Sequence, residues 1–159
     1  MALGEELRAL MRSFPSGVAV VTVSAGAERA GLTVGSLVWL SLEPPLVGVA
    51  INRESPFHEL LRAAEGFAVS LLSAGQEGLA QHFARSGMPP AVRWQGIRTR
   101  PGPLLGAPLL EGALGWIEAH RSAEHEAGSH TFFVGEALGL ERGPGAGALA
   151  YRDGRYHPL

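Results

Sequence analysis

Histidine is the residue in this chain best suited to proton transfer or metal binding near neutral pH. His120, His125 and His130 are spaced by five residues. On an extended strand, this spacing places His120 and His130 on one face and His125 on the other. Three ligands on opposite faces of one strand do not converge on a metal ion, so we do not expect a metal site. A turn near residue 128 would still pair two of them, but histidines on a solvated ribbon are more often plain surface residues.

The sequence lacks the common signatures of nucleoside triphosphatases, serine hydrolases and metalloproteases. It contains no Walker loop, no Gly-x-Ser-x-Gly elbow and no His-Glu-x-x-His pair. The glycine-rich segment 143–147 includes Pro144 and is not followed by a helical pattern, so we interpret it as a flexible turn. Cysteine is absent, which excludes disulfides and thiolate nucleophiles. Redox chemistry would therefore need a bound cofactor.

Two local patterns indicate where a ligand could bind. Gly and small hydroxyl residues interrupt the strand-like segment 31–47, which favours close approach of another molecule to the backbone. A β-bulge with satisfied hydroxyls explains this segment equally well. Ser55-Pro56 is typical of a helix N-terminus, where free N–H groups attract anions, and Arg53 precedes it. Without a ligand, Ser55 is only a helix cap and Arg53 a solvated charge.

Hydrophobic periodicity predicts the elements that must position these residues. Ser73 and Gln76 are expected to form a capping box, and Trp94 to anchor a long proline-rich surface loop over 88–110. Helices are predicted over 3–14, 56–64 and 76–84, and strands over 18–24, 30–40, 46–51, 67–72, 113–126, 130–141 and 149–156.

The order of these elements predicts one domain over residues 1–159. Its fold class is mainly β (α+β), as a small antiparallel Greek-key split barrel with two or three short helices. An open β-sandwich is the alternative.

Charge and hydropathy exclude several partners. The net charge is −2 and no basic stripe occurs, so nucleic acid is not expected to bind. The longest uncharged stretch, residues 13–27, is shorter than the ~18 apolar residues of a membrane helix. The first six residues are acidic rather than basic, which argues against a secretory signal. We therefore expect a cytoplasmic protein that does not cross a membrane.

Several motifs, in this order, resemble those of the flavin reductase-like family of FMN-binding split barrels. The segments are Phe14-Pro15-Ser16-Gly17, Gly31-Leu32-Thr33 through Pro44-Pro45-Leu46, Asn52 through Pro56, Phe67 through Leu72, His82-Phe83-Ala84 and Gly128-Ser129-His130. The resemblance covers nearly the whole chain. One departure is Ser129, which stands where the family usually has Asp next to the histidine.

This resemblance implies an NAD(P)H-dependent flavin reductase. Its cofactor would be FMN, with FAD as a possibility, and NADH or NADPH would donate the hydride. The family implies a homodimer that supplies reduced flavin to a flavin-dependent monooxygenase. A flavin-binding electron-transfer protein without nicotinamide-dependent turnover is the alternative, and a barrel that binds no flavin is a third. By resemblance, His130 would be catalytic, and the cofactor contacts would be Thr33, Val34, Gly35, Ser36, Ser41, Asn52, Arg53, Ser55, His82 and Phe83.

Overall fold

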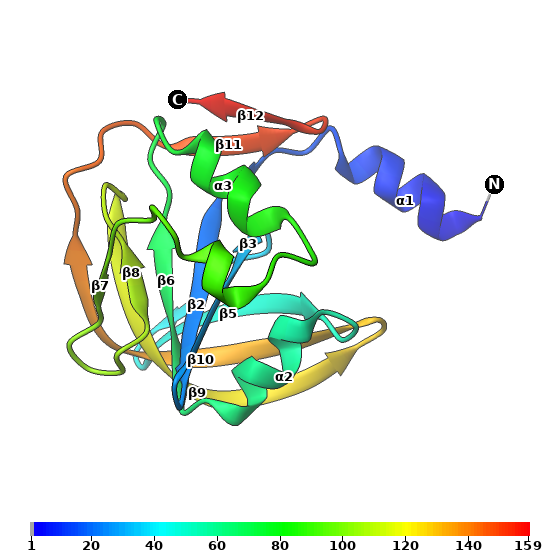
Figure 1. The fold of residues 1–159 in the computed structure, drawn as a ribbon. Coiled ribbons are helices and arrows are strands. Elements are labelled where there is room, and N and C mark those ends of the chain that lie inside the picture. Colours follow the sequence, from blue (N-terminus) through cyan, green and yellow to red (C-terminus); the bar gives the residue numbers. More distant parts are fainter. Residues whose placement is uncertain (1) are drawn as a thin grey trace.

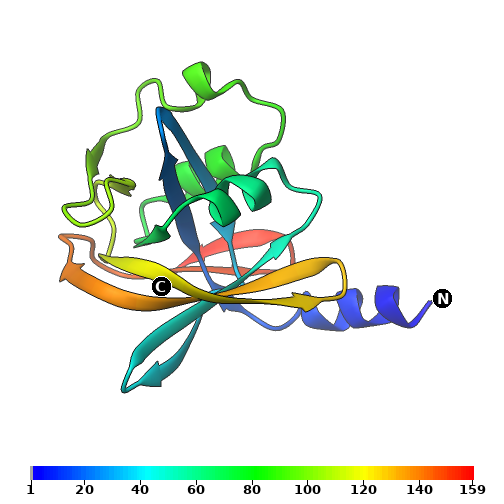
Figure 2. The ribbon, with the colours of Figure 1, turned by 90° about the horizontal axis from the view of Figure 1, so that it is seen from below.

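The computed structural model describes residues 2–159, and an antiparallel sheet of seven strands forms its main part. In spatial order, the strands are β3 (Glu28–Val34), β2 (Ala19–Ala25), β6 (Gly66–Leu71), β9 (Gly115–Ala127), β10 (His130–Arg142), β5 (Pro45–Asn52) and β4 (Val38–Leu42). Figures 1 and 2 show the sheet strongly twisted, so that the outer part of the long β9–β10 hairpin runs across the direction of β2 and β6. This arrangement confirms the predicted mainly β split barrel.

Two smaller sheets and four helices complete the described part of the chain. β1 (Ser16–Gly17), β11 (Leu149–Arg152) and β12 (Arg155–Pro158) form one sheet, and β7 (Thr99–Pro101) pairs with β8 (Pro108–Leu110). The helices are α1 (Leu3–Met11), α2 (Pro56–Ala63), α3 (Glu77–Ala84) and α4 (Pro90–Arg93). Figure 1 shows α1 projecting from the body, and none of its described residues is buried.

The core is divided between the two faces on which α2 and α3 lie. Phe67 and Phe133 from the sheet and Leu61 from α2 are fully or almost fully buried in one cluster. Phe83 from α3 and Trp94 belong to a second cluster. Burying each such side chain contributes roughly 1.5–3 kcal/mol relative to leaving it exposed. The two helices are therefore held firmly against the sheet, one on each side of β3.

Two predicted strands are broken in the structure. The expected strand 30–40 is divided, because the chain turns at residues 35–37 and the Ser36 hydroxyl bonds to both the N–H and the C=O of Ala50. The expected final strand is a hairpin of β11 and β12, because Asp153 and Gly154 have φ values of 52° and 75°, which make a tight turn.

The segment 88–110 is more ordered than predicted, since it contains α4, β7 and β8. Trp94 is buried there, as expected of an anchor, and its Nε1 donates to the Arg29 carbonyl at 3.2 Å. The capping box is only half formed. The Gln76 side chain accepts from the Ser73 N–H at 3.0 Å, but the Ser73 hydroxyl donates to Gly112 instead. None of the helices among the described residues is long and apolar enough to cross a membrane.

Packing at Gly135 in β10 gives a direct test of this arrangement. A Cβ at this position would lie 2.7 Å from Phe67 Cζ and 2.8 Å from Ala119 Cβ, all within the core. We expect Gly135→Ala to lower the free energy of unfolding by about 1–3 kcal/mol, because the core cannot yield without strain. Gly78→Ala is the matched control, since a Cβ there meets nothing within 4 Å in α3. Urea denaturation measures both, and equal stabilities of the two variants would contradict the packing described.

Candidate functional site

The edge strand β3 is lined by two neighbouring cavities. β3 pairs with β2 on one side only, so the other side of its backbone has no strand partner among residues 2–159. Both cavities include residues of β3, and both include Ala84 at the end of α3. A ligand lying along this edge would therefore contact both.

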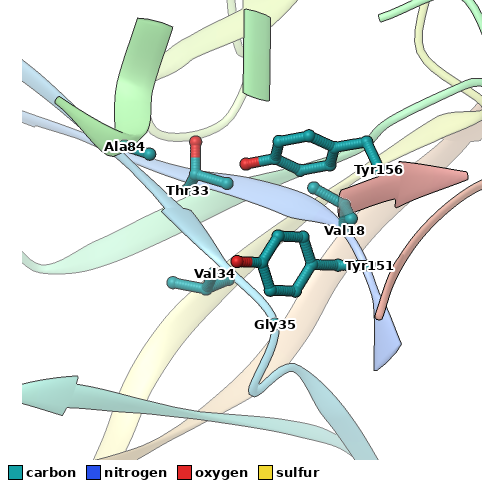
Figure 3. A pocket seen from close by; sticks show the side chains of 7 residues that line it. All are labelled: Val18, Thr33, Val34, Gly35, Ala84, Tyr151 and Tyr156. Carbon is teal, nitrogen blue, oxygen red and sulfur yellow. The ribbon is translucent and has the colours of Figure 1, made fainter. Parts of the chain in front are cut away.

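The first, which we call the aromatic cavity, has a volume of about 220 Å³. Figure 3 shows two tyrosine side chains from the C-terminal hairpin reaching toward Thr33 and Val34. The rings of Tyr151 and Tyr156 are 5.0 Å apart between centroids and tilted by 57°. No charged side chain is among its described lining residues: Val18, Thr33, Val34, Gly35, Ala84, Tyr151 and Tyr156.

The polar groups of the aromatic cavity are held in defined positions. The Thr33 hydroxyl donates to the Ala80 carbonyl at 2.7 Å, which fixes β3 against α3. A Cβ at Gly35 would lie 2.7 Å from Ser16 Oγ, so a larger residue here would require the Ser16 side chain to move. Burial, together with the nearby Tyr151 and Glu77, raises the pKa of Tyr156 above its usual value of 10.0. The Tyr156 hydroxyl therefore remains a hydrogen-bond donor at neutral pH.

The second, the cationic cavity, has a volume of about 360 Å³ and lies between β3, the N-terminus of α2 and the segment after α3. Arg29, Arg85 and Arg93 line it, against a single acidic residue, Glu28. Arg93 is occupied, since its guanidinium donates to the carbonyls of His82 and Arg85. Within residues 2–159, Arg85 itself takes part in no ion pair.

Ser55 connects this cavity to a helix N-terminus. Its hydroxyl accepts from the Phe57 N–H at 3.2 Å, so it caps α2 as the sequence predicts. The free N–H groups of the first turn add positive potential to that of the arginines. The cationic cavity is thus suited to a phosphate, and the adjoining aromatic cavity to an uncharged planar ring.

Comparisons with known proteins identify the family of this chain. Residues 11–159 match the model of the flavin reductase like domain. An NADH-dependent FAD reductase from Streptomyces globisporus is 39% identical over 152 residues, with 95% of this chain and 83% of the relative covered. The reductase component of 4-hydroxyphenylacetate 3-monooxygenase from Thermus thermophilus is 34% identical, and 98% and 96% of the chains are covered. This chain belongs to the flavin reductase-like family.

Solved structures of family members have the same fold. The flavin reductase component of a bacterial two-component tryptophan halogenase superposes with a TM-score of 0.91 at 34% identity, covering 98% of each chain. The NADH:FAD oxidoreductase of Streptomyces globisporus has the same TM-score at 37% identity, covering 99% of this chain and 93% of the other. The resemblance identified from the sequence motifs is therefore confirmed.

A second group of predicted residues lies at the β9–β10 turn, apart from both cavities. Half-buried His130 pairs with Asn52 of β5, and its Nδ1 is 2.9 Å from the Ser129 hydroxyl. Arg53 lies beside them. Its guanidinium forms a 2.8 Å ion pair with Glu126 and donates to the Gly128 carbonyl. These contacts hold the turn, and Arg53 does not line the cationic cavity.

The remaining predicted residues have structural contacts. Ser36 bridges to β5, as described above, and Ser41 lies half-buried in β4, where the pairing with β5 is irregular. His82 Nε2 is 2.6 Å from the Arg93 carbonyl. Phe83 is fully buried, with its ring 5.1 Å from that of Trp94. Neither His82 nor Phe83 lines either cavity, so within this chain Phe83 is a core residue rather than a lid.

Buried His58 connects the two parts of the structure. Its Nε2 is 2.7 Å from the Thr131 hydroxyl and its Nδ1 is 3.1 Å from a Glu59 carboxylate oxygen. Because a carboxylate only accepts, Nδ1 donates to Glu59, and a neutral ring accepts from Thr131. α2 is thereby tied to β10 one residue after His130. No group of three or more His, Asp or Glu residues suited to a metal ion occurs among the described residues.

Tyr151, Tyr156 and Arg85 line the two cavities but are not among the site residues predicted from the sequence. Tyr151 and Tyr156 face each other across the β11–β12 hairpin. The Asp153-Gly154 turn signal in the sequence could have indicated this pair. Arg85 carries no comparable signal, because only the path of the chain after α3 brings it to the same cavity as Ser55.

Proposed function

We propose that this protein is an NAD(P)H:flavin oxidoreductase that supplies reduced flavin to a partner monooxygenase. Its relatives support this activity, since they include NADH-dependent FAD and FMN reductases and the reductase component of a monooxygenase. Another relative, 35% identical, is an NADPH-flavin oxidoreductase from Streptomyces viridifaciens. We therefore propose either NADH or NADPH as the hydride donor. The proposed place of action is the cytoplasm, where reduced nicotinamide nucleotides are produced.

The observation that carries the proposal is the pairing of a neutral aromatic cavity with a cationic one along β3. FMN has the same division, with a planar uncharged ring at one end and a phosphate at the other. The described residues therefore fit the cofactor. In this arrangement, the tyrosines and the backbone of Thr33, Val34 and Gly35 surround the ring, while Ser55 and Arg85 hold the phosphate.

The bound flavin supplies the hydride chemistry, and the protein binds and orients the two nucleotides. We propose that His130 lies at the reacting ring of the flavin, as the family resemblance implies. His130 is not in the aromatic cavity of its own chain. We therefore propose that a second copy of the chain contributes His130 to the site, or that the nicotinamide bridges the two regions.

A homodimer is supported by two exposed apolar surfaces. Trp39 and Leu42 of the edge strand β4 have exposed fractions of 74% and 77%. α1 exposes Leu3, Leu7 and Leu10, and no described residue of this helix is buried. Unpaired apolar strands and unpartnered apolar helices are uncommon on monomers, because they promote association.

Turnover of NADH and NADPH tests the activity. We expect NAD(P)H oxidation to require added FMN or FAD and to slow in His130→Ala by about tenfold or more, the scale of a lost contact at the reacting group. His125→Ala is the matched control, because His125 is an exposed histidine of the same hairpin. Flavin binding without NAD(P)H oxidation would instead support an electron-transfer protein. Equal oxidation rates in the His130→Ala and His125→Ala variants would show that His130 is not catalytic.

Arg85 and Arg53 test the position of the phosphate. We expect Arg85→Ala to raise the Kd for FMN by about ten- to a hundredfold, since one charge-assisted contact is worth about 1.5–3 kcal/mol. Arg53→Ala is the control, because it also removes one exposed arginine. It should loosen the β9–β10 turn but leave the Kd for FMN nearly unchanged. Titration of flavin fluorescence measures both constants. The reverse order of effects would place the phosphate at Arg53, as the sequence alone suggests.

Trp39 tests the dimer. The wild-type protein should have twice the chain mass of 16.7 kDa in solution. Trp39→Glu should produce a monomer, because burying an unpaired carboxylate in an apolar interface is costly. Leu140→Glu is the control, since Leu140 is exposed to the same 74% but lies on β10. Light scattering after size-exclusion chromatography gives the masses, and a dimeric Trp39→Glu variant would exclude β4 from the interface.

A further inference from the structure

A third cavity extends the β3 site beyond the cationic cavity. Its volume is about 380 Å³, and its lining includes Trp94 and the start of β3. It shares Glu28, Arg29 and Pro90 with the cationic cavity. Three adjoining cavities thus follow β3 from Gly35 to Glu28, and the proposed phosphate position lies in the middle one. FMN, which ends at a single phosphate, would leave the third cavity free.

The third cavity contains a preformed stacking surface. The Arg29 guanidinium carbon lies 5.0 Å from the centroid of the Trp94 ring, and the Trp94 Nε1 donates to the Arg29 carbonyl. A guanidinium held over an aromatic ring keeps its other face available, and such planes stack on nucleic acid bases. The indole is 9% exposed, so Arg29 rather than Trp94 presents the accessible plane.

The charges of the third cavity favour a base over another phosphate. Glu28 and Arg29 line both cavities, but the cationic cavity has two further arginines, Arg85 and Arg93, that the third cavity lacks. A carboxylate repels phosphate but accepts hydrogen bonds from an exocyclic amino group such as that of adenine. The positive charge thus decreases where a dinucleotide passes from its diphosphate to its second base.

We propose that the third cavity binds the adenosine end of FAD, with adenine on the Arg29 plane, and that the protein therefore prefers FAD to FMN. This inference rests on the flavin site proposed above. The adenosine of NAD(P)H has the same chemistry. The FAD assignment is favoured because the cavity is continuous with the one that holds the flavin phosphate.

Ala91 provides the test. It is exposed in α4 and lines the third cavity but not the cationic one. Methionine at this position fills the cavity without adding charge or an aromatic plane. In the wild-type protein, the Kd for FAD should be lower than that for FMN. Ala91→Met should raise the Kd for FAD about tenfold, as expected for a lost base contact, and leave the Kd for FMN unchanged. The control is Val92→Met, because Val92 is 47% exposed and lines neither cavity.

The outcomes separate this inference from the proposed function. Equal affinity of the wild-type protein for FMN and FAD, or an unchanged FAD Kd in Ala91→Met, would overturn the adenosine subsite while leaving the flavin site intact. An increase in the KM for NADH, with FMN as the flavin and the FAD Kd unaltered, would assign the cavity to the nicotinamide nucleotide and overturn the FAD assignment. Failure of the wild-type protein to bind either flavin would contradict both proposals.

Discussion

The proposed site depends on the unpaired edge of β3. A sheet edge exposes backbone N–H and C=O groups that another molecule can use, and proteins usually cover or block such edges. Here α3 covers part of the edge through the Thr33 to Ala80 hydrogen bond, and α2 lies on the other side of the strand. The cationic cavity lies between these helices, and the aromatic cavity and the third cavity adjoin it along β3. If β3 were paired with β4, the barrel would be closed and the space that the three cavities occupy along β3 would be filled.

Two buried contacts keep this space in shape. Phe83 and Trp94 pack together in the core, and the Arg93 guanidinium donates to the Arg85 carbonyl, which holds the backbone that follows α3. His58 ties α2 to Thr131 on β10, so the helix that carries Ser55 cannot shift without disturbing the strand that begins at His130. The proposed phosphate position and the proposed catalytic histidine thus belong to one connected framework, although they lie in different parts of the chain.

The local part of this account could be predicted from the sequence. Ser55 caps α2, Trp94 anchors its loop, and Thr33, Val34 and Gly35 line a cavity, because short-range turn and strand chemistry determines these features. The contacts of Arg53 could not be predicted in the same way. Its partner, Glu126, is 73 residues away, and only the pairing of β5 with β10 brings the two together. Arg85 and the two tyrosines meet β3 for the same kind of long-range reason.

The most direct test of the central claim is hydrogen–deuterium exchange of the backbone amides with and without saturating FMN. We expect slower exchange over residues 28–35 and at the N-terminus of α2 when the flavin is bound. The exchange of α1 should not change in a preformed dimer. Protection confined to residues 52–53 and the β9–β10 turn, with none along β3, would contradict the proposed site and place the flavin at Arg53 and His130 instead.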